Sequence, residues 1–116
     1  MKSKDPITTH VLDTRLGKPA SNISCVLQRN GSKQWTEVGR GRTNSDGRVE
    51  LFEGGPSTLT PAIYRIIFDT GGYFRSQGLT GFYPEVVITF EVTSLEERYH
   101  VPLLLSPYGY STYRGS

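Results

Sequence analysis

Short apolar runs, separated by residues that favour turns, predict that this chain is built from β-strands. In Ala62–Phe68 and in Val86–Val92, apolar residues alternate with more polar ones, and this period of two predicts strands with one face toward a core. The remaining apolar runs predict strands at Ile7–Asp13 and at residues 23–29, 35–43, 48–52 and 100–105, with a tyrosine-rich strand after them.

Turn-forming residues mark the places where these strands are expected to end. Asn30 and Gly31 form a favoured hairpin dipeptide, and the cluster from Asn44 to Gly47 is rich in residues that tolerate a positive φ. The Gly-Gly-Pro segment at residues 54–56 is expected to end the strand that precedes it.

Two segments break the alternating pattern. Residues 73–78 (Tyr-Phe-Arg-Ser-Gln-Gly) lack a period of two, and we expect the one short helix of the protein there. Pro102 lies inside the run 100–105. Because proline cannot donate a hydrogen bond to a ladder, we expect that strand at a sheet edge, or with the proline nitrogen turned away from a partner.

The number and spacing of the strands predict an all-β protein with the fold of a β-sandwich. The length of 116 residues fits a single domain spanning 1–116, and no internal repeat is visible. Residues 1–6 are expected to form a flexible N-terminal segment. The 13 glycines and 7 prolines are scattered between the apolar runs, which agrees with many short strands joined by turns.

Charge and cysteine content narrow the classes of function. A net charge of +2 is too small to predict binding to nucleic acid or a membrane, and no apolar run approaches the length of a membrane span. The single cysteine, Cys25, excludes an internal disulfide framework, and its small or apolar neighbours predict a core position rather than a nucleophile. No apolar segment follows the basic start, so we expect no secretory signal and a cytoplasmic or peroxisomal location.

Histidine and arginine are the residues that could carry chemistry in this chain. His10 and His100 lie in separate predicted strands that can converge in space, and imidazole is suited to proton transfer near neutral pH. Arg48 and Arg114 each offer a rigid fork of donors to planar groups that carry oxygen. On local pattern alone, a structural histidine or a solvated arginine is the commoner interpretation. Two histidines do not make a convincing zinc site, and we expect no metal and no cofactor.

The C-terminal stretch carries the most specific pattern in the sequence. It begins His100-Val-Pro-Leu-Leu-Leu-Ser-Pro and ends Tyr-Ser-Thr-Tyr-Arg-Gly-Ser116. This stretch resembles the signature of the 5-hydroxyisourate hydrolases, the transthyretin-related enzymes of urate breakdown, and the Tyr-Arg-Gly-Ser ending is its most specific part. The similarity extends back to Thr9-His-Val-Leu-Asp13, so that it covers nearly the whole chain.

The resemblance implies a fold, an assembly and an activity. The fold would be a transthyretin-like β-sandwich of two four-stranded sheets with one short helix. The protein would be a homotetramer, a dimer of dimers, whose sites lie in the channel where two dimers meet. The activity would be the opening of the six-membered ring of 5-hydroxyisourate by water, which gives 2-oxo-4-hydroxy-4-carboxy-5-ureidoimidazoline without a cofactor.

The resemblance also implies roles for individual residues. The catalytic residues would be His10, Arg48, His100 and Ser116. The residues that shape the pocket and bind the substrate would be Tyr113, Arg114 and Gly115. The two imidazoles would activate water and move its proton, with the choice of general base open, and Arg48 would hold the substrate and stabilise the oxyanion. The final serine would act by its hydroxyl or by its terminal carboxylate.

Two other functions remain open at this point. A transthyretin-like carrier would bind a hydrophobic hormone in the same channel, but transthyretin has Lys, Glu and Thr at the positions of His10, Arg48 and His100, and these three residues would make the channel polar here. A structural or adhesion module would use the sandwich only for assembly and would turn over no small molecule.

Overall fold

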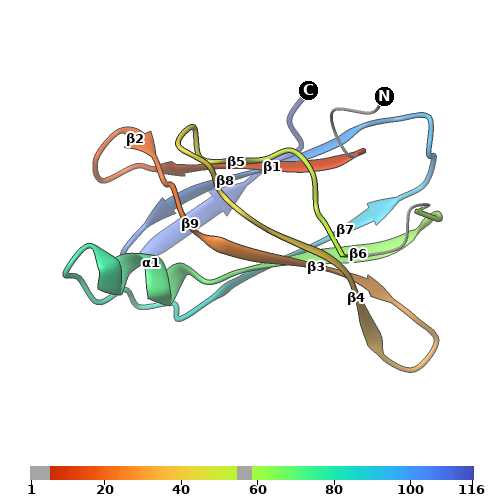
Figure 1. Ribbon diagram of the computed structural model, residues 1–116, viewed down its shortest axis with the longest axis horizontal. Helices are drawn as coiled ribbons and strands as arrows, with labels where there is room; N and C mark the ends of the chain where they lie inside the picture. Colours follow the sequence, from red (N-terminus) through yellow and green to blue (C-terminus); the bar gives the residue numbers. More distant parts are fainter. Residues whose placement is uncertain (1–5, 55–58) are drawn as a thin grey trace.

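The computed structural model describes residues 6–54 and 59–116 as a sandwich of two β-sheets with one short helix (Figure 1). The strands are β1 Ile7–Asp13, β2 Lys18–Pro19, β3 Ser24–Asn30, β4 Trp35–Arg42, β5 Arg48–Val49, β6 Ala62–Phe68, β7 Val86–Val92, β8 Tyr99–Ser106 and β9 Gly109–Thr112. The helix α1 spans Thr70–Ser76. The all-β fold class predicted from the alternating pattern is confirmed. The expected flexible segment 1–6 lies outside the described residues except for Pro6, as do Gly55 and Pro56 of an expected turn.

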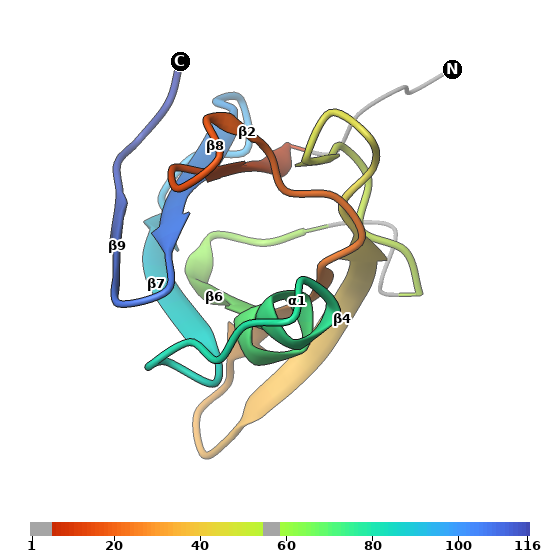
Figure 2. The same ribbon diagram turned by 90° about the vertical axis from the view of Figure 1, so that its left-hand side faces the viewer.

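The two sheets, called sheet A and sheet B here, differ in how their strands pair. Sheet B has four strands in the order β4-β3-β6-β7, all antiparallel. Sheet A follows the order β2-β1-β8-β9 and has five strands rather than four, because the two-residue strand β5 also pairs with β1. β1 and β8 run parallel, which brings the first and the last long strands of the chain together. Figure 2 shows the edge strands β7 and β9 on one side of the sandwich and β4 on the other.

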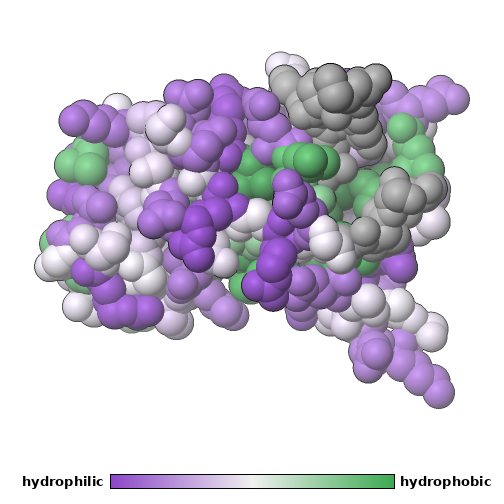
Figure 3. All heavy atoms as spheres, viewed as in Figure 1, coloured by the Kyte–Doolittle hydropathy of each residue, from purple (hydrophilic) through white to green (hydrophobic). Residues whose placement is uncertain are grey.

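The core lies between the sheets and is built mainly from alternate residues of β1, β3, β6, β7 and β8, with Val38 from β4. In β6, Tyr64, Ile66 and Phe68 are fully buried, while the residues between them are half-buried or exposed. β6 and β7 have the bounds that their period of two predicts. Burying each large apolar side chain stabilises the fold by roughly 1.5–3 kcal/mol, so the alternating residues hold one face of each strand against the core. Outside the core, hydrophilic side chains cover most of the face seen in Figure 3, and hydrophobic atoms show only in patches.

The helix begins earlier than the sequence predicts. It spans Thr70–Ser76 rather than 73–78, because the side chain of Asp69 accepts a hydrogen bond from Gly72 N (3.0 Å) and caps the first turn. Gly78, at a φ of 75°, follows its end. Within the described part of the chain, no helix is long and apolar enough to cross a membrane.

The strand that contains Pro102 is internal, so of the two arrangements expected from the sequence the edge position is wrong. β8 lies between β1 and β9. Gly115 N donates to His100 O (2.9 Å) and Thr112 Oγ1 donates to Pro102 O (2.6 Å), so the even-numbered residues of β8 turn their backbone groups toward the C-terminal segment. The missing N–H of Pro102 therefore faces Tyr113, and the regular ladder of β9 ends one residue earlier, at Thr112.

The segment predicted as a strand at 48–52 forms only the two residues of β5. Arg48 and Val49 pair with His10 and Thr9 of β1. After β5 the chain leaves sheet A, and Glu53 forms an isolated bridge with Arg40 of β4. The predicted strand thus passes from one sheet to the other, and sequence alternation alone does not reveal that crossing.

A buried carboxylate closes the C-terminal end of β1. Asp13 is fully buried, and its Oδ1 accepts hydrogen bonds from Arg15 N (2.9 Å) and Leu16 N (3.2 Å). Its Oδ2 accepts a hydrogen bond of 2.7 Å from the hydroxyl of Tyr73 in α1. Burial, followed by this hydrogen bond to a carboxylate, raises the pKa of Tyr73 above its usual value. Asp13 thereby joins the turn after β1 to the helix.

Candidate active site

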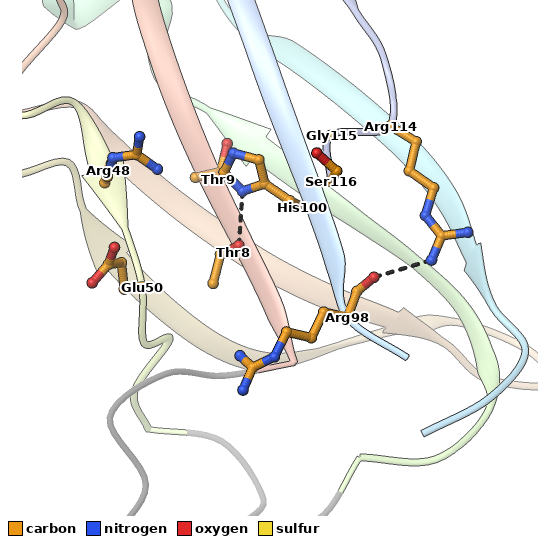
Figure 4. Close-up of a pocket in the computed structure, with 9 residues that line it drawn as sticks. All are labelled: Thr8, Thr9, Arg48, Glu50, Arg98, His100, Arg114, Gly115 and Ser116. Carbon is orange, nitrogen blue, oxygen red and sulfur yellow. Dashed lines mark hydrogen bonds between the residues drawn. The ribbon is translucent and has the colours of Figure 1, made fainter. Parts of the chain in front are cut away.

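A cavity of about 440 Å³ lies on the outer face of sheet A, where four parts of the chain meet. β1, β5 with the residue after it, β8 with the residue before it, and the C-terminal segment all contribute (Figure 4). The residues that line the cavity are Thr8, Thr9, Arg48, Glu50, Arg98, His100, Arg114, Gly115 and Ser116. The cavity therefore joins segments that are up to 108 positions apart in the sequence, from Thr8 to Ser116.

Arg48 is held in place by the turn that precedes it. Asn44 Oδ1 accepts hydrogen bonds from Asp46 N (2.9 Å) and Arg48 N (3.0 Å), as expected for an asparagine at a turn. Gly47 has a φ of 76° and passes so close to β1 that an added Cβ would lie 2.5 Å from Val11 O. The turn predicted from Asn44 to Gly47 is confirmed, and it brings Arg48 opposite His10.

His100 is fixed by neighbours on two sides. It lies beside Thr8 in the parallel ladder of β1 and β8, and a hydrogen bond of 2.8 Å joins Thr8 Oγ1 and His100 Nδ1. Gly115 packs against the ring, because a Cβ added there would lie 2.5 Å from His100 Cδ2. Gly115 N also donates to His100 O (2.9 Å). No side chain larger than hydrogen fits at position 115 unless the imidazole moves.

The four C-terminal residues predicted to form the pocket take different positions. Gly115 and Ser116 line the cavity, and Figure 4 shows Ser116 beside His100. The guanidinium of Arg114 turns away from His100 and donates to Glu97 Oε1 (2.9 Å) and to Arg98 O (3.0 Å). Tyr113 does not line this cavity; it lines a second one, of about 280 Å³, between β7 and β8.

His10 lies on the same sheet face but is not among the residues that line the cavity. It is half-buried, and it is flanked by Arg48 of β5 and Pro102 of β8 in the registers of its two neighbours. Since His100 is aligned with Thr8, two positions earlier along β1, strand geometry separates the two histidine Cα atoms by roughly 8 Å. Side chains at that diagonal spacing are within reach of one another, so the two imidazoles can flank one substrate ring.

Four cavity residues were not predicted from the sequence: Thr8, Thr9, Glu50 and Arg98. Thr9 adjoins His10 in β1, and the other three each lie two positions from a predicted residue, namely from His10, Arg48 and His100 respectively. In an extended chain, residues two apart point to the same face, so the period of two that placed the core could have found these three. That signal was present, but it applies to every polar residue of a strand and is weak by itself.

The charges at the cavity favour planar, oxygen-rich ligands. Arg48, Arg98 and Arg114 line it together with the side-chain carboxylate of Glu50. Guanidinium groups present paired donors to carbonyl or carboxylate oxygens, and the imidazole of His100 supplies a group that can exchange a proton. This arrangement can bind an electron-rich ring and move a proton at its edge.

Cys25 has no part in this site. It is fully buried in β3, and burial, opposed by the nearby Arg42, raises the pKa of its thiol to about 12. The predicted core position is therefore confirmed. Among residues 6–54 and 59–116, no group of three histidine, cysteine, aspartate or glutamate side chains is arranged to hold a metal ion.

Comparison with known proteins adds the family to this geometry. The model of the HIUase/Transthyretin family matches residues 7–115. The chain belongs to this family. It is 44% identical over 110 residues to the 5-hydroxyisourate hydrolase of Salmonella typhimurium, an alignment that covers 95% of this chain and 80% of that protein. The family resemblance seen in the C-terminal motif is thus confirmed.

Solved structures give the same fold for proteins with two different names. The structure of Klebsiella pneumoniae 5-hydroxyisourate hydrolase matches with a TM-score of 0.81 at 32% identity, covering 95% of this chain and 98% of that one. Transthyretin from Sparus aurata matches with a TM-score of 0.87 at 27% identity, covering 95% and 96%. The shape of the sandwich therefore does not distinguish a 5-hydroxyisourate hydrolase from a transthyretin. That distinction depends on the side chains on sheet A.

Proposed function

We propose that this protein is a 5-hydroxyisourate hydrolase that opens the six-membered ring of its substrate with water. The observation that carries the proposal is that His100, Arg48 and Ser116, from three distant segments, line one cavity in a chain 44% identical to a 5-hydroxyisourate hydrolase. The product would be 2-oxo-4-hydroxy-4-carboxy-5-ureidoimidazoline.

The reaction assigns a step to each of these side chains. A histidine takes a proton from water as the water oxygen adds to the ring carbonyl carbon. Arg48 stabilises the negative charge that develops on the carbonyl oxygen, because its guanidinium keeps its charge and points two donors at one group. The carbon–nitrogen bond of the ring then breaks, the nitrogen takes the proton from the imidazolium, and the carbonyl carbon becomes a carboxylic acid that releases its proton to solvent as a carboxylate.

His100 and His10 hold different positions in this scheme. His100 lines the cavity and is held by Thr8, so we assign it to the water. His10 lies beside Arg48 in the ladder and would reach the opposite edge of the substrate, where it helps to carry the proton. Gly115 and Ser116 would shape the wall beside His100, and Arg114 would form the rim through its contacts with Glu97 and Arg98.

The experiment that tests the function is the decay of freshly made 5-hydroxyisourate, followed by ultraviolet absorbance with and without the protein. The expected result is a rate well above the uncatalysed decay, in proportion to the amount of protein. A rate equal to the uncatalysed decay would refute the proposal. A hormone carrier is the weaker alternative, because Arg48, Glu50 and His100 would place charge where an apolar ligand has to bind.

The assembly is a second part of the proposal. A homotetramer, a dimer of dimers, would place a second copy over the outer face of sheet A and enclose the cavity together with His10. The support is that the half-buried residues His10 and Leu12 of β1 face outward from sheet A beside the cavity. Specific activity and sedimentation should then fall together on dilution, by mass action. Full activity in an isolated monomer would contradict a site that depends on assembly.

The cytoplasmic or peroxisomal location expected from the sequence stays a prediction.

A further inference from the structure

The C-terminal segment, residues 113–116, helps to form the cavity although it lies beyond a regular ladder. The pairing of β8 with β9 ends at Thr112. An isolated bridge, in which Gly115 N donates to His100 O (2.9 Å), then returns the segment to sheet A. Gly115 and Ser116 both line the cavity. A segment outside a regular ladder is held only as firmly as its own contacts, so the shape of this wall depends on what anchors it.

Arg114, directly before these two residues, supplies side-chain contacts that anchor the segment. Its Nη2 donates hydrogen bonds to Glu97 Oε1 (2.9 Å) and to Arg98 O (3.0 Å). Its Cζ lies 4.7 Å from the centroid of the Tyr99 ring, within the range of a cation–π contact. A carboxylate, a carbonyl and an aromatic face thus hold one guanidinium, and Figure 4 shows this side chain directed away from His100.

The partners of Arg114 belong to a turn that has hydrogen bonds of its own. The Tyr99 ring is buried, and its hydroxyl donates to Ser94 O and accepts from Ser94 N and Thr93 N, at 3.1 Å in each case. Glu97 N donates to Ser94 O (3.4 Å) in the turn between β7 and β8. This turn therefore presents the Glu97 carboxylate and the Tyr99 ring to the C-terminal segment in a fixed arrangement.

We propose that Glu97 is a positioning residue for the reaction: its carboxylate holds Arg114 and thereby keeps the last two residues at the cavity wall. The kinetic consequence rests on the proposed function, whereas the structural content, the order of the C-terminal segment, does not. A carboxylate beside a guanidinium accepts a charge-assisted hydrogen bond, which is stronger than a bond between neutral groups. Arg114 then serves the site by anchoring the segment rather than by contacting the substrate.

An exposed ion pair on β4 offers a matched control. Arg40 donates to Glu37 through Nε (2.7 Å) and Nη2 (2.8 Å), and the exposed side-chain fractions are 60% and 43%, compared with 58% and 52% for Arg114 and Glu97. Exposed ion pairs contribute little to stability, so neither pair is expected to decide whether the chain folds. The pairs differ in what they hold: Arg40 and Glu37 lie within a strand of sheet B, whereas Arg114 lies outside the ladder and next to Gly115.

The order of the C-terminal segment can be measured by NMR without any substrate. In ¹⁵N-labelled protein, amide hydrogen exchange at Gly115 reports how often its bond to His100 O opens. Glu97→Ala should speed this exchange about fivefold, the upper end of what an exposed ion pair contributes, and Glu97→Gln, which keeps a neutral acceptor, should speed it less. Glu37→Ala should leave it unchanged. Equal exchange at Gly115 in Glu97→Ala and in the wild type would overturn the proposal whether or not the protein is a hydrolase.

Salt provides a second test of the ion pair. At about 1 M NaCl the screening length falls to about 3 Å, so the attraction between the exposed charges of Glu97 and Arg114 weakens. Exchange at Gly115 in the wild type should then rise toward the value of Glu97→Ala, while the exchange in Glu97→Ala should hardly change. The same response to salt in both proteins would show that the carboxylate is not what holds the segment.

Kinetics test the consequence for the reaction. Because only the ordered segment completes the cavity wall, Glu97→Ala should lower kcat about threefold with KM within about twofold, and Glu97→Gln should have an intermediate kcat. Glu37→Ala should have the kcat of the wild type, and thermal unfolding should be the same in Glu97→Ala and Glu37→Ala. A merely structural Glu97 would instead lower stability and leave the kcat of the folded protein unchanged.

These outcomes separate the two proposals. If the wild type does not consume 5-hydroxyisourate but exchange at Gly115 responds to Glu97→Ala and to salt, the proposed function fails and the anchoring role of Glu97 stands. If the wild type is active and Glu97→Ala matches Glu37→Ala in exchange and in kcat, the anchoring role is refuted while the function stands. A lower kcat in Glu97→Ala with unchanged exchange at Gly115 would also refute it, because the effect would then not pass through the C-terminal segment.

Discussion

The two ends of the strand pair β1 and β8 each carry a polar cluster. The two clusters differ in burial and in what surrounds their polar groups. At the C-terminal end of β1, Asp13 is fully buried, and its oxygens accept hydrogen bonds from Arg15 N, Leu16 N and the Tyr73 hydroxyl. At the N-terminal end, Thr8 and His100 are half-buried, and their hydrogen bond faces a cavity of about 440 Å³.

The difference shows why one cluster is structural and the other is suited to chemistry. A turn and the helix α1 supply partners for the Asp13 carboxylate, so that its hydrogen-bonding capacity is used within the fold. The Thr8–His100 pair instead lies at the wall of the cavity on the outer face of the sheet. The same two strands therefore hold a stabilising group at one end and a reactive group at the other, and substitutions should separate the two roles.

The largest expected effect is the loss of activity in His100→Ala. Removing a positioned acid or base costs about 10²- to 10⁴-fold in kcat, and His10→Ala is expected to fall in the same range. The free energy of unfolding should change little, because the imidazole lies outside the core. Steady-state kinetics and urea denaturation measure the two quantities. Activity within a few-fold of wild type in both variants would remove the histidines from the mechanism.

Asp13→Ala should show the opposite behaviour. It leaves the buried hydroxyl of Tyr73 and the backbone N–H groups of Arg15 and Leu16 without their acceptor, which costs about 2–4 kcal/mol of stability. The kcat of the folded fraction should stay within a few-fold of wild type, since the cavity lies at the other end of the strands. A large fall in kcat without a loss of stability would show that the two clusters are coupled.

Arg48→Lys should weaken catalysis while it keeps the charge. A lysine offers a point charge in place of two parallel donors, so kcat/KM should fall about tenfold. The matched control is Arg42→Lys on β4, where the arginine is exposed and contacts the carbonyl oxygen of Asn22. Equal activity in the two variants would reduce Arg48 to an ordinary surface residue.

The smallest effect concerns the alkaline stability of the Asp13 cluster. The folded pKa of Tyr73 is raised, so its contribution to stability is full below about pH 10, the unfolded pKa, and is lost as the pH rises further. Tyr73→Phe should cost about 1 kcal/mol at neutral pH through the lost hydrogen bond, and this difference should shrink above about pH 10. Thermal or urea unfolding of both proteins between pH 7 and pH 11 tests the sign. A gap that widens with pH would contradict it.

Much of the fold could be predicted from the sequence because it depends on local repetition. β6 and β7 have the bounds that alternation predicts, since each strand buries one face regardless of its partner. The turn from Asn44 to Gly47 forms because Gly47 adopts a positive φ and the side chain of Asn44 accepts a hydrogen bond from Asp46 N. The C-terminal motif identified the family in the same local way, and with it the residues proposed for catalysis.

The contacts at the site were decided by tertiary structure. Thr8 meets His100 across 92 positions because β1 and β8 pair in parallel in one register, and a shift of one residue would turn the other face outward. The sequence left two arrangements open for Pro102, a sheet edge or a nitrogen without a ladder partner. Its strand is internal, because the missing N–H falls where the C-terminal segment leaves the ladder. Alternation fixes which face of a strand is buried, but the choice of neighbour and register comes from packing the two sheets together, and that choice brings Arg48, His100 and Ser116 to one cavity.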